Sequence, residues 1–466
     1  MHTLAPDRIE WKRPAIIVGT IVLATIVYLL MPADMNELAK RAVAIFIIAA
    51  VFWATEVIPL YATSLCLVGL QVLLLAHHGG LAPADVGPDG GNLQFTVFFT
   101  PFASPVIILF LGGFLLSSAV TKHALDRAIA AKVLDPFTRN PLLLIYGVML
   151  ITAFFSMWMS NTATTAMMLA IVAPLLKNLS DDGKFHLAVI LAVPMGANIG
   201  GIGTPIGTPP NAVALAALRQ GGFDVGFLDW MLVFVPLAVL LMAVAGVLLY
   251  FMLPPGKALS IPRLKHTEPI STRGKITLAI LVLTICLWLT GSWHGIDDAV
   301  IALIAAALLT GLQMLDRRDV DTIDWNILIL MWGGLALGNA MSQTGLVAYL
   351  MDLPIAQTTG FLLALTVVLL AYGLSTFMSN TAAANLIIPM ALAFPAPENV
   401  QLIILTALAC SFAMALPIST PPNAMAFATG RLPAATLLRV GGLISAIAIG
   451  VLLMGYQVML PLILNL

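Results

Sequence analysis

Long runs of apolar residues, separated by short polar stretches, occupy almost the whole chain. A helix needs about 20 apolar residues to cross a bilayer. Runs of roughly that length lie at 14–31, 42–58, 60–76, 103–120, 230–253, 276–291, 299–315, 325–341 and 435–460. Two more apolar segments, 186–218 and 401–429, are interrupted by Gly and Pro. The pattern predicts an all-α polytopic membrane protein with about eleven transmembrane helices.

Two other apolar segments, 141–177 and 360–395, carry a cluster of uncharged polar residues near the middle. The motif Ser-x-x-Met-Ser-Asn-Thr-Ala begins at Ser156 in the first segment and at Ser375 in the second. Polar side chains and broken backbone are costly in hydrocarbon unless they line a cavity or a site. We therefore predict two re-entrant hairpins whose tips meet around one ligand.

The two interrupted spans share a second motif, Thr-Pro-Pro-Asn, which ends at Asn211 in one and at Asn423 in the other. Proline removes a backbone N–H and glycine permits unusual backbone angles, so each break frees carbonyl groups on one side and amide groups on the other. A hairpin followed by a broken span occurs in both halves. We expect residues 1–253 to form a first repeat with an N-terminal span, 254–275 a cytoplasmic linker and 276–466 a second repeat.

Composition supports the membrane assignment. Hydrophobic residues make up 60% of the chain and charged residues only 9%, with a mean hydropathy of +1.03, whereas soluble domains are about a quarter charged. Cys66, Cys286 and Cys410 lie in apolar segments without metal or disulfide spacing, which predicts buried free thiols. No small-residue cleavage site follows the charged N-terminal residues, so we expect a retained first span rather than a signal peptide.

The distribution of basic residues predicts the topology. Of the 21 Lys and Arg residues, only Lys40, Arg41 and Arg219 fall on the side opposite the N-terminus. The positive-inside rule then puts the N-terminus in the cytoplasm and the C-terminus outside, in a multi-pass protein of the inner (plasma) membrane. The amphipathic stretch 121–139 holds four Lys or Arg and its counterpart 342–358 holds none. The hairpins are therefore expected to enter from opposite faces, as an inverted repeat typical of transporters.

The four polar loops at the tips and breaks indicate the chemistry of the site. Backbone carbonyls and Ser, Asn and Thr oxygens suit a hard cation, and helix N-termini suit an anion. The loops contain no Lys, Arg or His, so an anion bound there needs co-bound cations to neutralise it. They contain no carboxylate, which argues against a proton relay. Glu56 is the nearest membrane acid, and we expect it at a helix end rather than in the pathway.

Two other charged pairs are interpreted as ordinary surface features. Asp297-Asp298 falls in an expected loop, where both carboxylates would be solvated. Arg317-Arg318 is interpreted as a topology anchor rather than an anion site.

Paired Ser-Asn-Thr motifs, each followed about 40 to 50 residues later by Thr-Pro-Pro-Asn, resemble the divalent anion/sodium symporter (DASS) family, which includes solute carrier family thirteen and its bacterial relatives. The resemblance covers nearly the whole chain, and the ordered, doubled set of motifs is highly specific. It implies a homodimer with scaffold and transport domains, an elevator motion, and sodium-driven uptake of dicarboxylates, citrate or sulfate.

The resemblance also implies roles for individual residues. The first sodium site would use Ser156, Ser160, Asn161 and Gly207, and the second Ser375, Met378, Asn380 and Ser419, several of them through backbone carbonyls. The substrate carboxylates would meet Ser160, Asn161, Thr208, Ser379, Asn380, Thr381 and Thr420. No catalytic residue is expected.

We conclude from the sequence that the chain is a secondary active transporter, not an enzyme. The expected reaction is sodium-coupled symport of divalent anions, in first place the C4-dicarboxylates succinate, malate and fumarate, by an elevator mechanism. The alternatives are a sodium-independent dicarboxylate exchanger, or citrate or sulfate as substrate. A channel would not need two alternating re-entrant halves, and an enzyme would need a paired carboxylate, His-Glu-x-x-His or nucleophile–base motif that the membrane segments lack. The expected partners are sodium ions, the bilayer and a second copy of the chain, and no nucleic acid.

Overall fold

A computed structural model describes residues 12–77, 93–179, 184–256, 269–352 and 360–464. These residues form α-helices and short 3-10 helices, without a β-strand among them. Seven of the described helices have the length and apolar composition of a membrane span, and others are shorter but also apolar. The prediction of an all-α polytopic protein is confirmed. Most of the predicted linker lies outside the described residues.

The first half of the chain contains the helices up to α11. They are α1 (Lys12–Leu30), α2 (Glu37–Thr55), α3 (Leu60–Leu75), α4 (Thr96–Phe99), η1 (Thr100–Ala103), α5 (Pro105–Lys122), α6 (Leu125–Leu134), η2 (Asp135–Arg139), α7 (Pro141–Ser156), α8 (Asn161–Leu179), α9 (Phe185–Gly201), α10 (Pro209–Gln220) and α11 (Phe227–Met252). Most lie within a few residues of the predicted bounds, because Asn, Ser and Pro at the helix starts cap the first turn.

The second half of the chain begins at α12. Its helices are α12 (Thr272–Leu289), α13 (Gly291–His294), α14 (Asp298–Gly311), α15 (Arg317–Asp321), α16 (Trp325–Gln343), α17 (Leu346–Met351), α18 (Gly360–Phe377), α19 (Asn380–Ala391), α20 (Glu398–Ser411), α21 (Pro421–Ala428) and α22 (Ala434–Leu464). The short α17 falls in the predicted amphipathic stretch 342–358, part of which lies outside the described residues.

Each predicted hairpin consists of two helices joined at the Ser-Asn-Thr motif. Residues 157–160 separate α7 from α8, and residues 378–379 separate α18 from α19. Each predicted break is likewise a gap between two helices, α9 and α10 or α20 and α21. The second helix begins with the Pro-Pro pair in both cases, where proline is favoured because its missing N–H has no intrahelical acceptor to reach.

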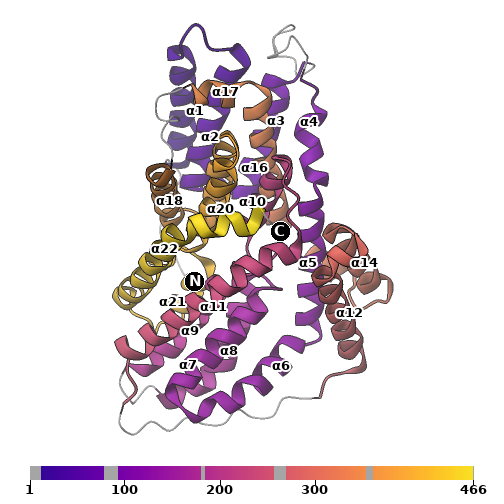
Figure 1. The fold of residues 1–466 in the computed structure, drawn as a ribbon, viewed down its shortest axis with the longest axis vertical. Coiled ribbons are helices and arrows are strands. Elements are labelled where there is room, and N and C mark those ends of the chain that lie inside the picture. The colour runs from indigo at the N-terminus through magenta and orange to yellow at the C-terminus, as the bar shows by residue number, and fades with distance from the viewer. Residues whose placement is uncertain (1–11, 78–92, 180–183, 257–268, 353–359, 465–466) are drawn as a thin grey trace, which may run out of the picture.

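The two halves interlock through these broken helices. α10, from the first half, packs against α19 and α20 of the second, and α21, from the second half, packs against α8 and α9 of the first. Figure 1 shows α7, α8 and α9 side by side at one end of the molecule and α1, α2 and α3 at the other. The polar tips and breaks are thereby brought together from both halves.

Small residues allow α7 and α9 to approach closely. A Cβ atom on Gly196 would lie 2.7 Å from the Met149 carbonyl oxygen and 3.1 Å from Thr152 Cβ. A Cβ atom on Gly200 would overlap the Ala153 backbone and side chain. The Gly-x-x-x-Gly spacing on α9 is the arrangement by which membrane helices pack with their backbones in near contact. It fixes the first hairpin against the broken helix that carries the first Thr-Pro-Pro-Asn motif.

The prediction of buried cysteines is correct only for Cys410. Cys66 and Cys286 are exposed on the outer faces of α3 and α12, and all three thiols are free. The prediction failed because hydropathy shows that a segment is apolar, but not which of its faces packs against protein.

Candidate functional site

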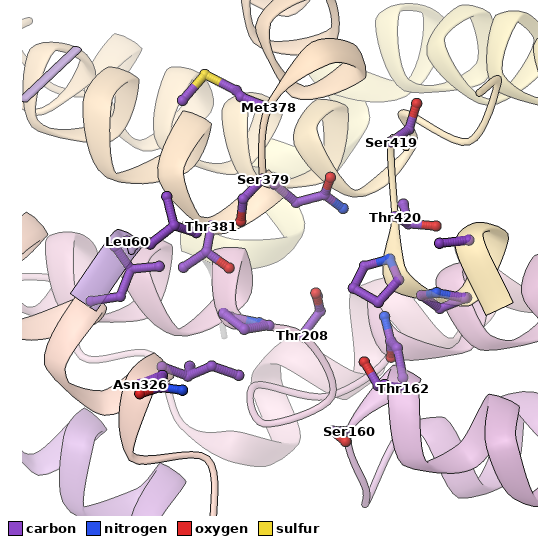
Figure 2. A pocket seen from close by; sticks show the side chains of 18 of the residues that line it. Leu60, Ser160, Thr162, Thr208, Asn326, Met378, Ser379, Thr381, Ser419 and Thr420 are labelled. Carbon is purple, nitrogen blue, oxygen red and sulfur yellow. The ribbon is translucent and has the colours of Figure 1, made fainter. Parts of the chain in front are cut away.

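The hairpin tips and the helix breaks surround one cavity of about 770 Å³. All the residues predicted to contact substrate line it, namely Ser160, Asn161, Thr208, Ser379, Asn380, Thr381 and Thr420. In Figure 2, Ser379 and Thr381 lie across the cavity from Ser160 and Thr162, with Thr208 between them. Both halves of the chain therefore contribute polar groups to one space.

Most of the residues predicted for sodium also reach this cavity. Ser160, Asn161, Gly207, Met378, Asn380 and Ser419 line it. Ser156 and Ser375 do not, because both are fully buried behind the tips.

Each buried serine holds the asparagine of its own tip. Ser156 Oγ bonds to Asn161 Oδ1 and lies 2.8 Å from the Ala197 carbonyl oxygen. Ser375 Oγ is 2.8 Å from Asn380 Oδ1 and 2.8 Å from the Cys410 carbonyl oxygen. The amide nitrogens of the two asparagines make no hydrogen bond within the described part of the chain. They remain available as donors to an anion in the cavity.

The asparagines that end the Thr-Pro-Pro-Asn motifs hold the two breaks in shape. Asn211 Nδ2 donates to the Gly201, Ile202 and Thr204 carbonyls at 3.0, 3.3 and 2.8 Å. Asn423 Nδ2 donates to the Met414 and Leu416 carbonyls at 2.9 and 3.0 Å.

In both motifs the asparagine bonds to the carbonyls of the residues nine and seven positions before it. Both asparagines are fully buried. Sequence reasoning gave them no role, although the repetition of Asn after Pro-Pro was the signal.

Oxygen atoms converge around the first break in a way that suits a cation. A Cβ atom on Gly201 would lie 2.7 Å from Asn161 Oδ1, 3.1 Å from Asn161 Nδ2 and 3.2 Å from the Gly207 carbonyl oxygen. A Cβ atom on Gly207 would lie 3.0 Å from the Ser156 carbonyl oxygen and would overlap the Gly201 carbonyl oxygen. Glycine at both positions keeps this small oxygen-lined space free of side chains. Gly201 is a further candidate ligand that the sequence did not single out.

The second break is built differently at the corresponding place. Ser419 stands where the first break has Gly207, and its Oγ donates to the Thr376 carbonyl at 3.0 Å. The same Oγ accepts from the Leu416 amide at 3.3 Å. The Ser419 hydroxyl therefore joins the second break to the second hairpin, and the residue also lines the cavity.

A buried asparagine connects the two halves beside the cavity. Asn198 lines the cavity from α9 and is 2% exposed. Its Nδ2 lies 3.2 Å from Thr420 Oγ1 and 3.3 Å from Asn423 Oδ1. This residue was not predicted, because no asparagine repeats it in the second half: counted back from the Thr-Pro-Pro-Asn motif, Cys410 stands at the equivalent place.

The wall formed by α2, α3 and α16 contributes the charge of the cavity. Among the described lining residues there is no Lys, Arg or His, and Glu56 is the one carboxylate. Glu56 caps α2 in the left-handed region with φ 48°. The expectation of a helix end is therefore confirmed, and Glu56 also lines the cavity. A turn that follows a helix directly can face a cavity.

A second acidic corner, between α12 and α14, corrects another prediction. Asp298 was expected in solvent but is 6% exposed. Its Oδ2 accepts from the Phe227 amide at 3.0 Å and lies 3.7 Å from Arg219 Nη2, and Asp297 Oδ2 lies 3.5 Å from Arg219 Nη1. Asp298 starts a helix that packs into the protein, and the sequence does not show which partner covers it.

Arg317 and Arg318, interpreted as an anchor, lie on the short helix α15. Nearby, Lys122 Nζ contacts Asp316 at 3.1 Å and Asp319 at 2.5 Å. The hydrogen bond from Lys122 lowers the pKa of the exposed Asp316 carboxyl. The contact places the end of α5 and the start of α15 on the same side of the molecule, as the predicted topology requires.

The family model described as the sodium:sulfate symporter transmembrane region matches residues 10–464, which is nearly the entire chain. This chain belongs to the divalent anion/sodium symporter family. The predicted resemblance is confirmed, and with it the assignment of a multi-pass membrane transporter rather than an enzyme.

Several transporters are similar to this DASS chain along most of its length. The sodium-dependent dicarboxylate transporter SdcS of Staphylococcus saprophyticus is 27% identical, over 96% of this chain and 91% of its own length. An uncharacterised transporter of Haemophilus influenzae is 30% identical, over 96% and 97%. An uncharacterised transporter of Schizosaccharomyces pombe is 30% identical over 87% of this chain, which spans about half (47%) of that longer protein.

Two solved structures resemble this DASS fold. The YdaH transporter of Alcanivorax borkumensis has a TM-score of 0.58 at 15% identity, covering 86% of this chain and 96% of that one. MtrF of Neisseria gonorrhoeae has a TM-score of 0.56 at 13% identity, covering 88% and 96%. At these identities the likeness shows the fold alone.

Proposed function

We propose that the protein is a sodium-coupled symporter of divalent anions, with C4-dicarboxylates as its expected substrates. The observation that carries the proposal is the cavity itself, lined by both Ser-Asn-Thr tips and both Thr-Pro-Pro-Asn breaks but by no described basic side chain. The names of the SdcS relatives favour dicarboxylates over the sulfate in the description of the family model. Citrate and sulfate are the alternative substrates.

The charge of the cavity supports coupling to cations. A bound dianion would face the Glu56 carboxylate and no described Lys, Arg or His. Taking an ion out of water costs several kcal/mol even after relaxation, and a helix N-terminus offsets only about 0.3–2 kcal/mol. Two sodium ions would supply the missing positive charge. The oxygen-lined space at Gly201 and Gly207 is the best-formed place for one of them.

The second sodium site is proposed around Ser375, Met378, Asn380 and Ser419, as the resemblance implies. Asn380 Oδ1 and the Cys410 carbonyl oxygen each lie 2.8 Å from Ser375 Oγ there. Hydroxyl, amide and backbone carbonyl oxygens are the ligand types that a hard cation prefers. Ser419 can offer a lone pair while its proton stays on the Thr376 carbonyl.

The packing supports an elevator motion as part of the proposal. The helices α7 to α11 and α18 to α22 pack mainly on one another, and they carry the tips and breaks. The rest of the cavity wall comes from α2, α3, α5 and α16, which belong to the set α1 to α5 and α12 to α16. We propose the first set as the transport domain and the second as the scaffold. We further propose that the protein forms a homodimer, that its two halves are an inverted repeat, and that its N-terminus is cytoplasmic.

Uptake into proteoliposomes tests the coupling directly. We expect an inward sodium gradient to drive accumulation of labelled succinate, and replacement of sodium by choline to abolish it. Malate and fumarate should compete, and citrate and sulfate report the alternatives. Equal uptake in sodium and choline, with faster entry when the lumen holds unlabelled succinate, would contradict the symporter and identify an exchanger.

A further inference from the structure

Two corners of the scaffold are built on the same plan, one between α2 and α3 and the other between α12 and α14. Trp53 lies near the end of α2, and its indole Nε1 donates to the carbonyl of Leu60, the first residue of α3, at 3.3 Å. Trp288 near the end of α12 donates in the same way to Asp298, the first residue of α14, at 3.0 Å. Both tryptophans are buried, and both corners carry carboxylates.

The transport helices present an arginine at matching places. Arg219 follows Asn211 by eight residues, and Arg431 follows Asn423 by eight residues. Each arginine therefore lies just past the second helix of its broken span or at that helix's end. The predicted topology puts Arg219 on the face of Asp298 and Arg431 on the face of Glu56.

Among the residues that the structure describes, only the first arginine, Arg219, forms ion pairs with an acidic corner. Arg219 is paired with Asp297 and Asp298. Arg431 and Glu56 are exposed, and neither makes an ion pair within the described residues.

The apolar residues of the tips and breaks show the same asymmetry. Trp158 of the first tip stacks with Phe227 at a centroid distance of 6.0 Å, and Phe227 stacks on Trp288 at 4.7 Å. The residue equivalent to Trp158 in the second tip, Phe377, is 72% exposed.

Ile206 before the first Thr-Pro-Pro-Asn motif is 7% exposed, whereas its equivalent, Ile418, is 70% exposed. One acidic corner is therefore closed by the transport helices, and the other stands open on the cavity.

We propose that Arg431 and Glu56 form an ion pair in the opposite state of the transport cycle, and that this pair alternates with the pair between Arg219 and the Asp297-Asp298 corner. The inference rests on the proposed elevator motion. In the opposite state Phe377 would lie against the Trp53 corner, as Trp158 now lies against the Trp288 corner. Glu56 would then serve as a docking group for the transport helices, besides lining the cavity.

Loss of one pair and loss of the other should change the labelling rate of a single cysteine in opposite directions. In a background with Cys66, Cys286 and Cys410 replaced by Ser, a Phe377→Cys variant in nanodiscs would report the open corner by its rate of reaction with an anionic maleimide. Asp297→Asn removes a charge but keeps an oxygen to cap α14, and it should slow labelling. Arg219→Gln should act in the same direction. Loss of an exposed pair changes such an equilibrium by about 1.4- to 5-fold.

The variants Glu56→Gln and Arg431→Gln should both speed labelling, because both remove the pair of the opposite state. Direct electrostatics on an anionic reagent gives another result: loss of Glu56 would speed labelling, and loss of Arg431 would slow it. Effects of opposite sign from these two variants would therefore overturn the proposal. The exchanged variant, Glu56→Arg with Arg431→Glu, should return the rate toward that of the parent.

Asp324 provides the matched control. It precedes Asn326 of the cavity wall by two residues and is another carboxylate on the predicted face of Arg431. Asp324→Asn should leave labelling unchanged; an effect equal to that of Arg431→Gln would assign the pair to Asp324 and overturn the role of Glu56. Labelling needs no transport, so succinate uptake by the parent protein tests the proposed function separately.

Discussion

At the scale of residues, the cavity asparagines illustrate how one side chain can serve two ligands. The Oδ1 atoms of Asn161 and Asn380 face the buried serines Ser156 and Ser375. Their amide nitrogens have no hydrogen-bond partner among the described residues. An amide held in this way directs its oxygen toward a cation pocket and its N–H groups toward an anion. Sodium and substrate would therefore bind the same side-chain amide, sodium through its oxygen and the substrate through its N–H groups.

Replacement of either asparagine tests this arrangement. We expect Asn161→Ala and Asn380→Ala each to weaken succinate binding by about 10- to 150-fold, since a hydrogen bond to a charged group contributes roughly 1.5–3 kcal/mol. Binding would be measured by calorimetry on purified protein in saturating sodium. Thr162→Ala is the matched control, because Thr162 lines the cavity but belongs to neither predicted ligand set. Binding as tight as that of the unmodified protein in both Asn variants would place the site elsewhere.

The sequence singled out these residues as candidates, but it did not show which of them are buried and which line the cavity. The doubled motif picked out Ser156 and Ser375 together with the asparagines, yet the serines are fully buried and the asparagines line the cavity. Adjacent positions at a helix end point in different directions, and the chain order does not record which direction meets the cavity. Asn198 was missed for a related reason, since its partners Thr420 and Asn423 come from more than 200 residues away.

At the scale of elements, the first hairpin depends on close contact between α7 and α9. Gly200→Ala would place a methyl group into Ala153, and overpacking of this kind costs about 1–3 kcal/mol. Alanine also favours a helix over glycine by about 0.8–1 kcal/mol, which offsets only part of that cost. We expect a lower melting temperature in detergent and weaker sodium-dependent uptake.

Gly373→Ala in α18 provides a control of opposite sign. A Cβ atom at Gly373 would meet nothing within 4 Å, so only the gain in helix propensity remains, and the melting temperature should rise or stay level. If Gly200→Ala were at least as stable as Gly373→Ala by thermal unfolding, the tight packing of α7 on α9 would be refuted.

The sequence predicted most elements because apolar length and Pro-Gly punctuation are local signals. It could not separate a hairpin arm from a full span by length, since α18 is itself long and apolar enough to cross a membrane. Only the polar turn at Ser379 indicated that α18 is the arm of a hairpin. The corner at Asp298 was misjudged because its burial comes from Arg219 and Phe227, both distant in the chain.

At the scale of the whole molecule, sodium and substrate should bind as one coupled system. If sodium tightens substrate binding by some factor, substrate must tighten sodium binding by the same factor. Because the cavity has no described basic residue and has Glu56 on its wall, we expect that factor to be large. Sodium is therefore expected to bind before the dianion.

Serine variants separate the cation pockets from anion recognition. Ser156→Ala and Ser375→Ala should raise the sodium concentration needed for half-maximal uptake, while the preference among succinate, malate and citrate changes little. Thr366→Ala, at an exposed position of α18, is the control for general damage. A changed preference among anions at unchanged sodium dependence would show that these serines serve the substrate instead. Uptake measured over a range of sodium concentrations decides between the two outcomes.

The interlocking of α10 and α21 with the opposite half has a consequence for how the protein is made. α10 ends at Gln220, but its packing partner α20 ends at Ser411, about 190 residues later. At roughly 5–20 residues per second of synthesis, the first break waits about 10–40 s in the membrane without the helices that cover it. During that interval Asn198, whose hydrogen-bond partners Thr420 and Asn423 lie in the second half, depends on the insertion machinery or on water. A slower ribosome lengthens this exposed interval, and truncation after the first half makes it permanent.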